Sequence, residues 1–75
     1  MININSNSSI YSIISNYPDV KNIMVELGFK DIVKPGMLRS MGRIMTINKG
    51  CSMKNIDIEI VREVFLKYNY TLEEE

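Results

Sequence analysis

Short apolar stripes at helical spacing, each closed by a helix-breaking residue, constrain this 75-residue chain more than any other feature. The first stripe consists of Ile10, Ile13, Ile14 and Tyr17. This spacing is typical of a helix with one buried face. Ser8 and Ser9 precede the stripe as good N-caps. Pro18 ends it, because the residue before a proline is driven out of the helical region.

A second stripe begins directly after Pro18, which can also open a helix because a first turn leaves its N–H groups unpaired. Gly28 fits the left-handed residue that closes a helix, and we expect Phe29 behind it to fold back on the core. The apolar positions of this second helix are Val20, Ile23, Met24 and Leu27.

The middle of the chain predicts two weaker helices after an irregular stretch at residues 30–36. Gly42 lies inside the first of them and is expected to weaken it by up to about 1 kcal/mol relative to alanine. Thr46 is a good cap for the second, which we expect Gly50 to weaken or stop. The apolar positions of the first are Met37, Leu38, Met41, Ile44 and Met45.

The clearest helix opens at Asn55 or Asp57 and closes near Asn69, a residue that tolerates the left-handed conformation. Its charged residues lie outside the stripe, and Tyr70 and Leu72 are expected to fold back after it. The buried stripe is Ile58, Val61, Val64 or Phe65, and Tyr68.

These stripes predict an all-α fold, a compact single-domain bundle of about five short helices over residues 9–72. Ile2 and Ile4 alternate with polar residues, a pattern that fits a short strand or an adaptable tail, but asparagine and serine are poor in strand interiors. Residues 1–8 are therefore predicted to be a flexible tail. Residues 73–75 are three glutamates and are predicted to be an acidic tail.

The residue types that carry most catalytic and metal chemistry are scarce. The chain has no histidine and no tryptophan, and Cys51 is its one cysteine. This composition excludes a disulfide framework, a zinc cluster and a histidine-dependent catalytic triad. The four glycines are scattered and form no phosphate-binding loop. We therefore expect no enzyme activity, no metal site and no cofactor.

Two observations bear on where the protein acts. No apolar run approaches the roughly 18 residues that span a bilayer. The Asn- and Ser-rich start also lacks the basic flank and apolar core of a signal peptide. We expect a bacterial-type cytoplasmic protein that does not bind membranes.

Charge is balanced overall, with nine basic and nine acidic residues, but it is unevenly distributed. Residues 30–54 hold six basic residues against one acidic residue, net +5. Residues 55–75 hold two against six, net −4, and residues 1–29 hold one against two, net −1. Nucleic-acid binding needs a domain that is basic as a whole, so it is not expected. A polarised surface suits a protein partner or a homodimer, although the charges could simply solvate the domain.

The basic segment also carries a methionine ribbon, because Met37, Met41 and Met45 recur every four residues beside two arginines. One interpretation is a docking surface with a cationic rim, since methionine-rich surfaces adapt to varied partners. The other is that the ribbon fills the core and that the arginines pair with Asp31 or with the acidic C-terminal helix. The candidate binding residues are Lys34, Met37, Arg39, Met41 and Arg43.

The run Ile-Tyr-Ser-Ile-Ile-Ser-Asn-Tyr-Pro at residues 10–18, followed by the second apolar stripe and Glu-Leu-Gly-Phe at 26–29, resembles a known family. It is similar to the opening of the small bacterial and archaeal domain-of-unknown-function family DUF1858. Residues 57–70 resemble that family's final helix, so the likeness covers roughly residues 9–72. The resemblance implies a bundle of about five short helices and assigns no activity.

Many members of that family carry a cysteine pair just after the Leu-Gly step, which suggests redox or metal chemistry for them. A similar domain opens iron–sulfur-cluster repair proteins that carry a hemerythrin-type di-iron domain. Residues 30–36 of this chain contain no cysteine, so we identify it as a cysteine-less branch. Our leading hypothesis is a non-enzymatic interaction or accessory module, with a hemerythrin-like or redox-sensing protein as partner. The alternative is a small-ligand or redox-binding domain with Cys51 as its reactive atom, which requires a lowered thiol pKa.

Overall fold

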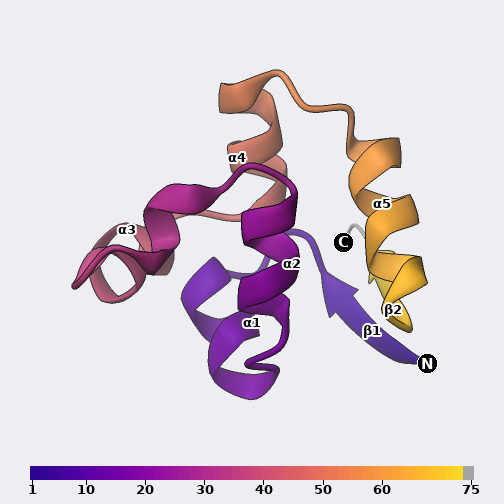
Figure 1. Ribbon diagram of the computed structural model, residues 1–75, viewed down its shortest axis with the longest axis horizontal. Helices are drawn as coiled ribbons and strands as arrows, with labels where there is room; N and C mark the ends of the chain where they lie inside the picture. Colours follow the sequence, from indigo (N-terminus) through magenta and orange to yellow (C-terminus); the bar gives the residue numbers. More distant parts are fainter. Residues whose placement is uncertain (74–75) are drawn as a thin grey trace.

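The computed structural model describes residues 1–73 as five α-helices, one short 3-10 helix and two strands (Figure 1). The elements in chain order are β1 (Ile2–Asn5), α1 (Ile10–Asn16), α2 (Val20–Glu26), η1 (Lys30–Val33), α3 (Met37–Ile44), α4 (Ile47–Lys54), α5 (Ile58–Lys67) and β2 (Tyr70–Glu73). The five helices confirm the predicted helical bundle.

A two-stranded parallel sheet joins the two ends of the chain, so the prediction of an all-α fold with a tail at residues 1–8 is wrong. Ile4 of β1 lies opposite Leu72 of β2, and both side chains are buried. Backbone hydrogen bonds run from the Ser6 N–H to the Glu73 carbonyl at 2.7 Å and from the Ile2 N–H to the Asn69 carbonyl at 3.3 Å. Burial of alternate side chains outweighs the poor strand preference of the intervening asparagines.

Helices α1 and α2 follow the capping signals of the sequence. The Ser9 hydroxyl accepts a hydrogen bond from the Ser12 N–H at 3.1 Å, which satisfies one free donor of the first turn. Gly28 closes α2 with a φ of 106°, a left-handed conformation that suits glycine. The Phe29 N–H then donates to the Met24 carbonyl at 2.9 Å, and the Phe29 ring returns to the core as predicted.

Helix α4 runs through Gly50, so the prediction that this glycine stops the helix is wrong. The Thr46 hydroxyl caps the helix by accepting from the Lys49 N–H at 3.1 Å. The helix then continues to Lys54, where Asn55 turns into the left-handed conformation with a φ of 59°. Gly50 is buried, and packing against its bare backbone offsets its weak helix preference.

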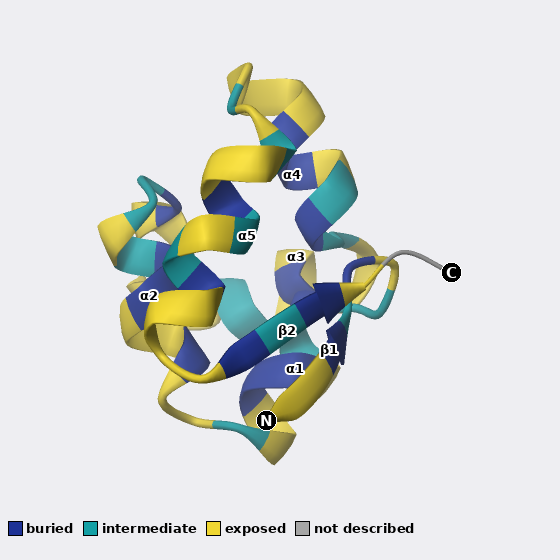
Figure 2. Ribbon diagram, turned by 90° about the vertical axis from the view of Figure 1, so that its right-hand side faces the viewer, coloured by how far each residue is buried: buried dark blue, intermediate teal, exposed yellow. Residues whose placement is uncertain are grey.

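The core lies between α1, α2, α4, α5 and the sheet, and Figure 2 shows buried positions on their facing sides. Val61 and Phe65 of α5 are fully buried, as the stripe predicts. Tyr68 is 42% exposed, which corrects its predicted place in the core. Its helix ends at Lys67, and Tyr70 takes the buried place on β2 instead.

Two further expectations concern the chain end and the membrane. Glu73 of the predicted acidic tail lies in β2, and residues 74–75 lie outside the described residues. Over residues 1–73, every helix is too short or too polar to cross a bilayer.

Candidate functional site

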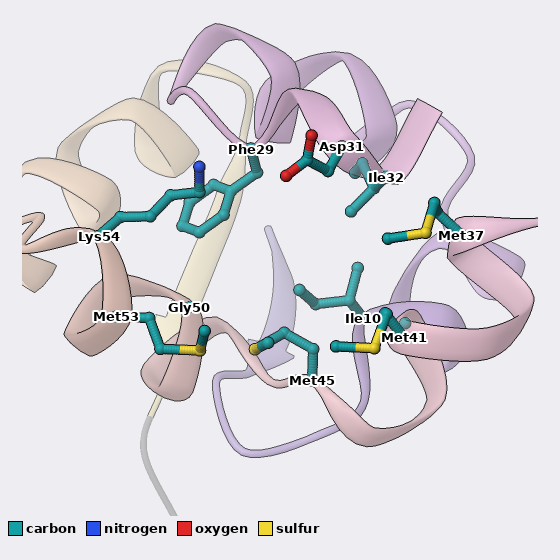
Figure 3. A pocket seen from close by; sticks show the side chains of 11 residues that line it. Ile10, Phe29, Asp31, Ile32, Met37, Met41, Met45, Gly50, Met53 and Lys54 are labelled. Carbon is teal, nitrogen blue, oxygen red and sulfur yellow. The ribbon is translucent and has the colours of Figure 1, made fainter. Parts of the chain in front are cut away.

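An apolar pocket of about 160 Å³ opens between α1, η1, α3 and α4. Figure 3 shows its side chains around a central hollow, with Met37 and Met41 on one side and Met53 and Lys54 on the other. Within the described chain, Asp31 and Lys54 are the charged residues of its lining. The lining consists of Ile10, Phe29, Asp31, Ile32, Met37, Met41, Gly42, Met45, Gly50, Met53 and Lys54.

Backbone contacts of α1 hold the α3–α4 junction in place. The Ile10 N–H donates to the Met45 carbonyl at 2.9 Å, and Ser9 bridges to Thr46. These contacts bring the last residue of the methionine ribbon beside Ile10, which is itself buried. The floor of the pocket is therefore a fixed part of the fold.

Two glycines allow the walls of the pocket to approach closely. A Cβ at Gly42 would lie 3.0 Å from Leu38 Cδ1 and 3.5 Å from the Tyr11 nitrogen. A Cβ at Gly50 would lie 2.6 Å from Phe29 Cε1, closer than two carbon atoms can pack. The Phe29 ring thus lies directly on the α4 backbone, where it forms one wall of the pocket.

Basic residues lie on the surface of the segment that forms most of this pocket. All six basic residues of the 30–54 segment are exposed. Lys34 pairs with Asp31 at 3.1 Å, and the Arg43 guanidinium carbon lies 4.7 Å from the centre of the Tyr11 ring. The Lys54 ammonium lies 5.9 Å from the centre of the Phe29 ring. Of these cations, Lys54 lines the pocket, and Lys34 pairs with the lining residue Asp31.

The basic helix α3 lies apart from α5, the helix of the acidic C-terminal segment. Figure 1 places α3 and α5 on opposite sides of the molecule. Within the described residues, neither Arg39 nor Arg43 forms an ion pair, so the alternative in which they tie to Asp31 or to α5 is wrong. Lys34 alone of the candidate cations pairs with Asp31.

The candidate residues divide between the pocket and its surroundings. Met37 and Met41 line the pocket together with Met45, which we expected on the same ribbon. Met37 and Met45 are half-buried, while Met41 is 40% exposed. The ribbon is therefore neither core filling alone nor a wholly exposed surface. Lys34, Arg39 and Arg43 lie outside the lining, on the same basic segment.

Sequence reasoning missed the contribution of α4 and of the segment after α2. Phe29 and Ile32 come from the turn and η1, and Met53 and Lys54 come from the end of α4. The available signal was Gly50, because a glycine inside a helix often marks the close approach of another group. We interpreted Gly50 only as a residue that weakens or stops the helix.

Cys51 does not line the pocket. The thiol is buried, with 4% of the residue exposed, and it is not among the described residues that line the pocket. Burial raises the pKa of the Cys51 thiol, the opposite of the direction that the redox alternative requires. The residue packs as part of the apolar core.

A second polar cluster ties α2 to the end of α5. The Tyr68 hydroxyl donates a 2.6 Å hydrogen bond to Glu26 Oε1, and the Lys67 ammonium lies 3.5 Å from Glu26 Oε2. The hydrogen bond from Tyr68 lowers the pKa of Glu26, and the Lys67 charge adds to this effect. The same hydrogen bond raises the pKa of Tyr68.

Comparison with known proteins places the chain in a family. The sequence pattern of the family described as "Domain of unknown function (DUF1858)" matches residues 4–61. The chain belongs to the DUF1858 family. The match to DUF1858 begins at Ile4, so it includes the second half of β1. The family's description assigns no activity.

The expected DUF1858 membership is thus confirmed, but the description of this chain as a cysteine-less branch is wrong, because Cys51 is present. What the chain lacks is a cysteine at residues 30–36, where η1 forms instead. No curated protein and no solved structure matches the chain significantly.

Proposed function

We propose that this DUF1858 protein is a non-enzymatic interaction module that docks an acidic, apolar segment of a partner protein on its α3–α4 face. The observation that carries the proposal is the position of the pocket: its methionines lie on the one segment with a net charge of +5. An apolar centre surrounded by polar surface is the usual anatomy of a protein-binding surface.

The chemistry of the pocket supports binding rather than catalysis. Most of its lining is hydrocarbon and thioether, and Asp31, one of its two charged residues over residues 1–73, already pairs with Lys34. Met41 is 40% exposed and Met53 is 73% exposed, so their side chains are available to a partner. Methionine is unbranched and polarisable, which lets such a surface adapt to the shape of what it binds.

The charge distribution supports an acidic partner. Lys30, Arg39 and Lys49 are exposed, and none of them forms an ion pair with a described residue. Their field speeds the encounter with an acidic segment and disfavours a basic one. The family resemblance suggests a hemerythrin-like or redox-sensing protein as the first partner to test.

Affinity capture with a matched pair of charge reversals tests the proposal. Arg39→Glu reverses a charge of the basic segment on α3, the helix that carries Met37 and Met41, and Lys21→Glu makes the same change on α2, outside the basic segment. Both side chains are exposed, so each substitution should change the free energy of unfolding by less than about 1 kcal/mol. We expect capture of the partner to be lost in Arg39→Glu and kept in Lys21→Glu.

Equal capture by both charge variants would contradict the proposal, as would a protein that remains alone and monomeric in the presence of its genomic neighbours' products. A partner recovered with both the Arg39→Glu and the Lys21→Glu variants would bind elsewhere on the molecule.

A further inference from the structure

We infer that the methionine-lined pocket is a binding site for one aromatic ring, supplied by a phenylalanine side chain of the acidic partner segment. This inference rests on the proposed function and deepens it, because it names the group that anchors the partner. Three features of the pocket carry it: its volume, its sulfur atoms and the charge at its mouth.

The volume fits a single ring. An apolar cavity of about 150 Å³ in an unrelated protein stays dry and binds benzene. The present pocket has a volume of about 160 Å³, close to that of the benzene-binding cavity. A water molecule needs two to four polar partners, and within the described chain the charged residues of the lining are Asp31 and Lys54 alone. An apolar guest is therefore favoured over water.

The sulfur atoms favour an aromatic guest over an aliphatic one. Four methionines line the pocket, three from the α3 segment and Met53 from α4. A thioether sulfur about 5 Å from a ring contributes about 0.3–1.5 kcal/mol beyond ordinary packing. Phe29 adds an aromatic wall, against which a second ring can pack edge to face. Figure 3 shows these side chains on several sides of the same hollow.

The charge at the mouth of the pocket favours an acidic peptide segment as the carrier of the ring. The Lys54 ammonium lies beside the Phe29 ring at the edge of the hollow, and Lys30 is exposed next to Phe29 in the sequence. A carboxylate beside the inserted ring would meet the Lys54 ammonium. A buried aromatic anchor with a charged surround is the arrangement in which a few residues supply most of the binding energy.

The six methionines of the chain provide a built-in control for a direct test. In the full chain with ¹³C-methyl methionine, toluene should shift the four methyl signals of Met37, Met41, Met45 and Met53 in a saturable manner. Met24 is fully buried in the core and Met1 is 78% exposed, and neither lines the pocket. Their signals should stay in place. Shifts in all six signals, or in none, would overturn the inference.

Two matched comparisons test the chemistry of the guest. Methylcyclohexane has nearly the shape of toluene without a π-system, and it should bind several-fold more weakly. An acetylated, amidated pentapeptide with phenylalanine between two pairs of glutamates should bind about tenfold more tightly than the same peptide with central alanine. Equal binding of the two hydrocarbons, or of the two peptides, would overturn the inference.

A pair of variants places the ring in the pocket. Met53→Asp puts a carboxylate at the mouth, and Ile60→Asp makes a comparable change at an exposed position of α5. Toluene binding should be lost in the first variant and kept in the second. If toluene fails to bind but Arg39→Glu still abolishes capture, this inference is wrong and the proposed function stands. If toluene binds and the Arg39→Glu variant still captures the partner, the proposed function is wrong instead.

Discussion

The Phe29 ring packs against the backbone of Gly50 so closely that a Cβ at residue 50 would lie 2.6 Å from the ring atom Cε1. This contact joins the turn after α2 to the middle of α4 and builds one wall of the pocket. It also explains why a residue with low helix preference lies inside a helix.

Replacing Gly50 with alanine should therefore destabilise the protein. In an open helix the change to alanine stabilises by roughly 0.5–1 kcal/mol, but here the added methyl group should cost about 1–3 kcal/mol by overpacking. Thermal or urea unfolding would measure the difference. Ser52→Ala, at an exposed position of the same helix, should stay within about 0.5 kcal/mol of the wild type. A Gly50→Ala variant more stable than the wild type would show that Phe29 does not press on α4.

The strand at the N-terminus should contribute to stability as a core element. Ile4 is 2% exposed, so Ile4→Ala should cost about 2–5 kcal/mol of unfolding free energy. Ile2 belongs to the same strand and is 43% exposed, so Ile2→Ala serves as its matched control with a much smaller effect. Equal and small losses for the two variants would mean that residues 2–5 behave as a tail.

The parts of the fold that sequence predicts well are those set by near neighbours. The Ser9 cap, the Gly28 left-handed end and the Asp57 cap each depend on groups within a few residues. The pairing of Ile4 with Leu72 is different, because it brings together the two ends of the chain. The alternation of Ile2 and Ile4 is too short a local signal to outweigh the poor strand preference of asparagine, and burial against the helices stabilises the strand.

The same division applies to the candidate site. The repeat of Met37, Met41 and Met45 correctly predicts one apolar ribbon beside basic residues. The opposite wall could not be predicted, because Phe29 and Met53 meet the ribbon only through tertiary packing. Tyr68 continues the helical stripe in sequence, yet α5 ends at Lys67 and leaves its hydroxyl free to reach Glu26.

The tie between Tyr68 and Glu26 should make stability depend on pH in a defined direction. A carboxyl group with a lowered pKa stabilises the folded state fully above its unfolded-state value, and this contribution is lost as the pH falls through the folded value. The stability advantage of the wild type over Tyr68→Phe should thus be constant near neutral pH. It should shrink as the pH falls below the usual glutamate value of about 4.5.

At alkaline pH the stability advantage is lost in the opposite direction, as the pH rises, because the pKa of Tyr68 is raised above its usual value of 10.0. The advantage should be lost as the pH rises through that raised value. Melting temperatures across the pH range would measure the loss of stability at acid and at alkaline pH. Tyr11→Phe is the control, since the Tyr11 ring contacts Arg43 through its face rather than its hydroxyl. A pH-independent difference for Tyr68→Phe would contradict the tie.

Amide chemical-shift mapping tests most directly whether the α3–α4 face is the docking surface. The uniformly ¹⁵N-labelled chain would be titrated with the phenylalanine-centred acidic pentapeptide at low salt. We expect saturable shifts confined to residues around the pocket, from Phe29 through η1, α3 and α4 to Lys54, with α5 and β2 unchanged. These shifts should weaken as salt screens the charges of the basic segment. Shifts centred on α5 or the sheet, or none that saturate, would contradict the assignment of the α3–α4 face as the docking surface.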